Sequence, residues 1–79
     1  MRENNMAIIA DNIWKAAHEQ NLHPLIRSIE GKSFRSCNVC ILNIFTSVVD
    51  VILPVVREAV ASYDANIVVG DIGISVIFD

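Results

Sequence analysis

The sequence predicts an α+β domain in which two or three helices pack on one face of a small two- or three-stranded sheet, in the order α-α-β-α-β-β. Three observations lead to this prediction. Apolar residues recur at intervals of three and four near the start of the chain, β-branched residues alternate near its end, and Gly70-Asp71 divides that last segment like the turn of a hairpin. With 79 residues, the chain is expected to form one small domain over residues 1–79.

Two helices are expected in the first third of the chain. Over residues 5–20, the apolar positions with helical spacing are Met6, Ile9, Ala10, Ile13, Trp14 and Ala17. His23-Pro24 then starts a second, short helix over residues 24–30, because proline suits the first helical position. Gly31 is the expected C-terminal stop of this helix.

The rest of the chain predicts a strand over residues 34–45, a main helix over 47–63 and a C-terminal hairpin. The start of the main helix is open between Ser47 and Asp50, because Pro54 costs about 3 kcal/mol in a helix interior. The hairpin turn at Gly70-Asp71 would pair Val69 with Ile72 and Ile67 with Ile74. One long strand with a bulge near a glycine is the alternative.

The composition predicts association. Hydrophobic residues make up 53% of the chain and charged residues only 19%, against a usual value of about 25% for charged residues. A chain of this length buries only about 60–70% of its unfolded surface. One face of the sheet should stay uncovered, and Cys40, Leu42, Ile44 and Ile77 are predicted to line it. We therefore expect a homodimer that closes through this face or through a strand edge.

Charge and hydropathy exclude other partners. A net charge of −3 argues against a general nucleic-acid-binding protein, which needs a basic surface. Residues 39–56 are long enough to cross a bilayer, but Asp50 and Pro54 interrupt them, so no membrane span is expected. The first residues do not resemble a secretory signal, and a cytoplasmic location is expected.

The two cysteines form a C-x-x-C spacing, Cys37-Asn38-Val39-Cys40. In a regular strand, positions i and i+3 point to opposite faces, so a mutual disulfide or a redox pair does not fit. A zinc site formed by His18, His23, Cys37 and Cys40 is the alternative. Whether the basic residues Arg27, Lys32 and Arg35 converge on an anion is left open.

The sequence contains no phosphate-binding loop, no G-x-G-x-x-G and no H-E-x-x-H. We expect no catalytic residue, no cofactor and no bound metal. The predicted function is a small non-enzymatic interaction module, either a homodimeric adaptor or an inhibitor or regulator acting through protein contacts. A zinc-stabilised binding module is the alternative function.

Overall fold

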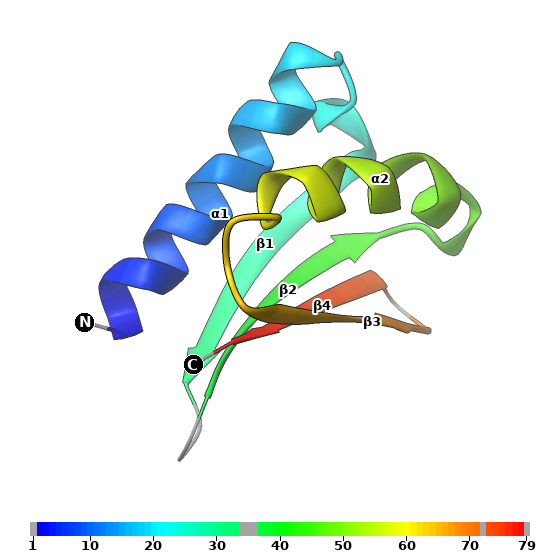
Figure 1. The fold of residues 1–79 in the computed structure, drawn as a ribbon. Coiled ribbons are helices and arrows are strands. Elements are labelled where there is room, and N and C mark those ends of the chain that lie inside the picture. Colours follow the sequence, from blue (N-terminus) through cyan, green and yellow to red (C-terminus); the bar gives the residue numbers. More distant parts are fainter. Residues whose placement is uncertain (1, 34–36, 72, 79) are drawn as a thin grey trace.

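The computed structural model describes residues 2–33, 37–71 and 73–78, which form a four-stranded antiparallel sheet and two α-helices (Figure 1). The elements are α1 (Arg2–Glu19), β1 (Ile26–Ser33), β2 (Asn38–Ile44), α2 (Val49–Ala59), β3 (Ala65–Gly70) and β4 (Gly73–Phe78). Short 3₁₀ turns precede β1 (His23–Leu25) and α2 (Thr46–Val48). The strand order is β1-β2-β4-β3, so each helix is followed by an antiparallel pair of strands and the two pairs meet at β2 and β4.

Both helices cover the same face of the sheet, and the core lies between them and the strands (Figure 1). The helices contribute buried residues at helical spacing, among them Ile9, Ile13 and Ala17 of α1 and Ile52, Val55 and Val56 of α2. The strands contribute alternate residues, which are Cys40, Leu42, Ile44, Ile74, Val76 and Phe78. This agreement between helical and strand periodicity fixes which face of each element points inward.

The predicted order α-α-β-α-β-β on a two- or three-stranded sheet is wrong, because the segment predicted as a second helix forms β1. Pro24 starts only a single 3₁₀ turn, and the chain then pairs with β2 from Ile26 to Ser33. Gly31 does not stop a helix. A Cβ atom at this residue would lie 2.6 Å from Met6 Sδ, so the glycine lets α1 pack closely on β1. The coarser description of the chain as α+β holds.

The C-terminal hairpin forms, but its register differs from the prediction. Gly70 pairs with Gly73 and Val69 with Ile74, so Gly70 belongs to β3 and not to the turn. Ile72, the predicted partner of Val69, lies outside the described residues. Gly73 has a φ angle of 154°, and a Cβ atom there would overlap the carbonyl oxygen of Leu42 on β2. Only glycine adopts this φ angle readily and leaves room for the carbonyl oxygen of Leu42, which explains why a glycine occupies the first position of β4.

The main helix is shorter than predicted. It begins at Val49, with Asp50 in its first turn, and Pro54 lies inside it. Because proline has no amide hydrogen, the helix lacks the hydrogen bond from residue 54 to the carbonyl of Asp50. Within the described ranges, neither helix combines the length and the apolar character that a membrane crossing requires.

Candidate interaction surface and pocket

The structure separates the four residues predicted to line an interface. Cys40 and Leu42 are fully buried, and Ile44 is almost so, because they lie on the side of β2 that the helices cover. The prediction that these three residues line the uncovered face is wrong. Ile77 does lie on the uncovered face, where it pairs with Val39. Both sides of β2 are apolar, so its sequence did not show which side the helices would cover.

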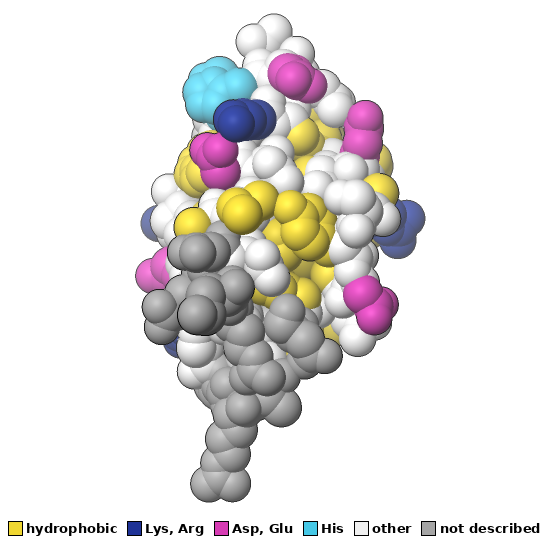
Figure 2. All heavy atoms as spheres, turned by 60° about the vertical axis from the view of Figure 1, so that its left-hand side comes forward, with side chains coloured by type: hydrophobic (Ala, Val, Ile, Leu, Met, Phe, Trp, Pro, Cys, Tyr) yellow, Lys and Arg dark blue, Asp and Glu magenta, His cyan; other side chains and the backbone are white. Residues whose placement is uncertain are grey.

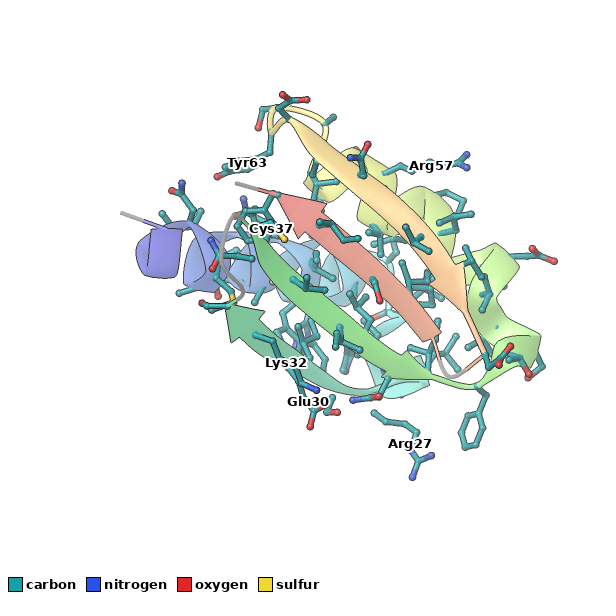
Figure 3. All side chains as sticks on the ribbon, turned by 90° about the horizontal axis from the view of Figure 1, so that it is seen from below. Arg27, Glu30, Lys32, Cys37, Arg57 and Tyr63 are labelled. Atoms are coloured by element: carbon teal, nitrogen blue, oxygen red, sulfur yellow. The ribbon has the colours of Figure 1, made fainter. Side chains whose placement is uncertain are left out.

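The uncovered face carries apolar and polar residues side by side. Cross-strand pairing places Val39 beside Ile77, and places Ile41 and Val68 on either side of Ser75. Glu30 and Lys32 lie at the β1 border of this face (Figure 3). The remaining polar residues of the face are Ser28, Asn43 and Asn66. A partner laid flat on this face would therefore bury several polar groups, each at a cost unless it finds a hydrogen bond.

The two edges of the sheet differ in how they are protected. β1 carries Arg27, Glu30 and Lys32, and its register shifts between Ile26 and Ser28. Charged side chains and bulges are the features by which edge strands resist pairing with other chains. β3 has no charged residue and pairs with β4 without a register shift. The exposed edge of β3, residues 65–70, is called the β3 edge below.

The β3 edge also holds two of the large apolar side chains that the fold leaves exposed. Val68 is 49% exposed and Val69 is 51% exposed. The other exposed large apolar residues of the described chain, Ile8, Phe45 and Val51, lie on separate elements. Figure 2 shows a further side of the molecule, where a patch of hydrophobic side chains is surrounded by acidic, basic and histidine side chains. Val68 and Val69 differ from the other exposed apolar residues because they are consecutive in one strand and point to opposite faces of the sheet.

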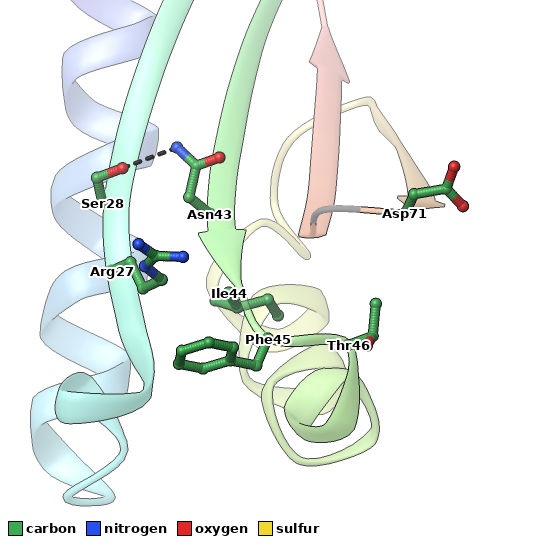
Figure 4. Close-up of a pocket in the computed structure, with 7 residues that line it drawn as sticks. All are labelled: Arg27, Ser28, Asn43, Ile44, Phe45, Thr46 and Asp71. Atoms are coloured by element: carbon green, nitrogen blue, oxygen red, sulfur yellow. Dashed lines mark hydrogen bonds between the residues drawn. The ribbon is translucent and has the colours of Figure 1, made fainter.

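A pocket of about 580 Å³ lies at the end of the sheet where β1 begins and β2 ends (Figure 4). The guanidinium carbon of Arg27 lies 5.3 Å from the ring centroid of Phe45, in cation–π contact. Asn43 Nδ2 donates hydrogen bonds to Ser28 Oγ at 2.7 Å and to Glu30 Oε2 at 3.1 Å. Ile44, Thr46 and Asp71 complete the lining.

This pocket has mixed charge and offers no activated nucleophile. Arg27 and Asp71 stand on opposite sides of it (Figure 4), so it does not select one sign of charge. Among the described residues that line it, there is no histidine or cysteine that could act as a base or nucleophile. Arg27 and Lys32 lie at opposite ends of β1, roughly 16 Å apart at the usual rise per residue, so these two do not converge on one anion. Arg35, the third member of the predicted basic set, lies outside the described residues.

The predicted zinc ligands are not brought together. His18 and His23 stack on each other, with ring centroids 3.9 Å apart. His23 precedes β1, whereas Cys40 pairs with Gly31 near the other end of that strand. Among the described residues, which include all four predicted ligands, no group of three or more His, Cys, Asp and Glu residues could hold a metal ion.

Both cysteines are free thiols in different surroundings. Cys37 is half-buried just before β2. Cys40 is buried in the core, where its thiol donates a weak hydrogen bond to the carbonyl oxygen of Met6 at 3.6 Å. Burial raises the pKa of the Cys40 thiol to about 11, so it stays protonated and unreactive near neutral pH.

Comparison with protein-family models, with curated proteins and with solved structures finds no match. Sequence reasoning missed the two exposed residues of the β3 edge, Val68 and Val69. The available signal was a run of six residues, 65–70, without a single charge.

Proposed function

We propose that this chain is a small, non-enzymatic protein-interaction module that works as a homodimer, in the role of an adaptor, inhibitor or regulator. The observation that carries the proposal is the apolar surface that the fold leaves uncovered, above all Val68 and Val69 on the β3 edge. Burial of apolar surface contributes about 25 cal/mol per Å², so covering these side chains with a second copy contributes favourably to association.

A role in protein contacts also agrees with the rest of the described surface. The pocket residues offer no pair of nucleophile and base, so we assign no catalytic residue. The net charge is −3, and Arg27 and Lys32 are separated, so we propose no nucleic-acid partner. Both cysteines are free, which suits the reducing cytoplasm, the compartment we propose.

Sedimentation equilibrium tests the homodimer. An interface that consists of one strand edge buries less than the usual value of about 800 Å² per partner, so we expect dissociation in the micromolar range. The measured mass should rise from 8.7 kDa toward twice that value between about 1 and 500 μM protein. A mass that stays at 8.7 kDa across this range contradicts the proposed homodimer.

A further inference from the structure

We infer that the homodimer forms at the β3 edge, through antiparallel pairing of β3 with β3 of a second copy about a two-fold axis at Val68. The inference rests on the proposed homodimer and names its surface and its register. The two four-stranded sheets would then join into one continuous sheet.

The two exposed valines of β3 point to opposite faces of the sheet. Val68 pairs with Ser75 and faces the uncovered side of the sheet, whereas Val69 pairs with Ile74 and faces the helix side. A partner that rests on one face of the sheet can cover only one of these side chains. An added strand lies beside β3 and contacts both.

The two edges of the sheet differ in their protection against an added strand. β3 lacks the charges and the bulge that protect β1, so strand addition is favoured at β3 and opposed at β1. A two-fold contact that uses β3 of both copies is closed, because no second β3 edge remains. Assembly should therefore stop at a dimer and not continue into a fibre.

The apolar residues of β3 favour one register for the pairing of two copies. In an antiparallel pair, directly opposite residues share a face, so an axis at Val68 sets Val68 opposite itself and Ile67 opposite Val69. Both exposed valines then meet an apolar side chain. An axis at Ile67 would instead set Val68 opposite Asn66 and Val69 opposite Ala65, which leaves the valines with smaller or polar partners. The axis at Val68 is therefore preferred.

The charges that flank β3 give this dimer a distinctive salt dependence. Asp64 and Asp71 are exposed and lie directly before and after the strand. In the inferred register, Asp71 lies opposite Ala65 of the second copy and next to that copy's Asp64. These like charges repel each other and salt screens them, so the dimer should tighten as the salt concentration rises. A partner strand with basic flanks would show the opposite trend.

Two lysine substitutions at matched sites test the surface. Val68→Lys sets two positive charges opposite each other across the axis and should raise the dimer dissociation constant at least about tenfold. Val51→Lys is the control, because Val51 is also a valine, is 47% exposed and lies on α2. This control should change the dissociation constant less than about twofold. Far-UV circular dichroism checks that both variants are folded.

Cysteine crosslinking tests the register, in a Cys37→Ser background that removes the half-buried native thiol. With the axis at Val68, the two Cα atoms of residue 68 lie about 4.5–5.5 Å apart, within the range for a disulfide. Val68→Cys should therefore form a crosslinked dimer on mild oxidation. Asn66→Cys lies on the same strand and face, but its two copies are four residues apart, about 13 Å, and should not crosslink.

The outcomes separate this inference from the proposed function. A wild-type protein that stays monomeric overturns both. A dimer that Val68→Lys leaves intact overturns the β3 edge as its interface but leaves the homodimer standing. Crosslinking of Asn66→Cys as fast as that of Val68→Cys overturns the register. A dimer that weakens as salt rises overturns self-pairing at β3.

Discussion

Replacing Gly73 by alanine should force the start of β4 away from β2, at the end of the pairing between these two strands. The new Cβ atom would overlap the carbonyl oxygen of Leu42 and lie 3.0 Å from its carbonyl carbon and 3.3 Å from the amide nitrogen of Ile44. All three are backbone atoms, which cannot move aside as the end of a side chain can. The φ angle of 154° adds a second penalty, because residues with a Cβ atom rarely adopt it.

The expected loss is a large part of the total stability. Backbone strain of this kind costs about 1–3 kcal/mol, and the collision with β2 adds to it, so we expect a loss of at least about 2 kcal/mol. A domain of 79 residues has a total stability of about 4–12 kcal/mol. With a urea dependence of about 1 kcal/mol per molar, the midpoint of unfolding should fall by about 2 M.

The fluorescence of Trp14 is a suitable signal, because it is the single tryptophan and packs against the core from α1. Both proteins must be compared at one concentration, since dimerisation shifts the midpoint. Gly70→Ala is the matched control, because Gly70 pairs with Gly73 but its new Cβ atom would meet, among the described residues, only the carbonyl oxygen of Gly73, at 3.9 Å. We expect Gly70→Ala to change stability by no more than about 1 kcal/mol. Equal midpoints for Gly73→Ala and wild type would refute the reasoning.

Three further perturbations test the core, the main helix and the buried thiol. Leu42→Ala empties a fully buried position and should cost about 2–5 kcal/mol in urea unfolding; a cost below about 1 kcal/mol would place Leu42 outside the core. Pro54→Ala restores an amide donor inside α2 and should raise the thermal midpoint, with a gain of about 1–3 kcal/mol; a lower midpoint would mean that the proline fits this helix. Iodoacetamide should modify Cys40 at least about 100-fold more slowly in folded than in unfolded protein at pH 8, and equal rates would contradict its burial. Because folded Cys40 holds its proton more tightly than the unfolded thiol, whose pKa is near 9.0, the free energy of unfolding should fall as pH rises from that value toward about 11.

Strong local periodicity made two elements predictable. The helix expected over residues 5–20 corresponds to α1, and its apolar stripe at Ile9, Ile13 and Ala17 is buried as expected. The strand expected over residues 34–45 corresponds to β2 over Asn38–Ile44, while residues 34–36 lie outside the described part of the chain. In both segments the local pattern agrees with the type of element that forms, so the sequence alone was sufficient to predict a helix and a strand there.

β1 could not be predicted from local pattern because tertiary pairing decides it. Leu22, Leu25, Ile26 and Ile29 have helical spacing, and Gly31 is a common helix stop. The segment becomes a strand because β2 has a free edge to pair with and because α1 needs the space above Gly31. Neither condition is visible within residues 22–31.

The candidate surface was only partly predictable for a related reason. Alternation along β2 correctly separated its residues into two sets, but both sets are apolar, and only the position of the helices shows that Cys40, Leu42 and Ile44 are inside. The exposure of Val68 and Val69 depends on β3 being at the edge of the sheet. Strand order depends on the topology of the whole chain and cannot be predicted from residues 65–70 alone.

The meeting of β2 and β4 at the centre of the sheet has a consequence for how the chain folds. Each half consists of a helix and two strands that are neighbours along the chain, so its contacts can form early over short loops. The pairing of β2 with β4 joins residues that are between 30 (Asn43 and Gly73) and 40 (Asn38 and Phe78) positions apart, and so requires a much longer loop to close. We therefore expect the joining of the two halves to limit the folding rate, and substitutions along β2 and β4 to slow folding more than substitutions in the outer strands.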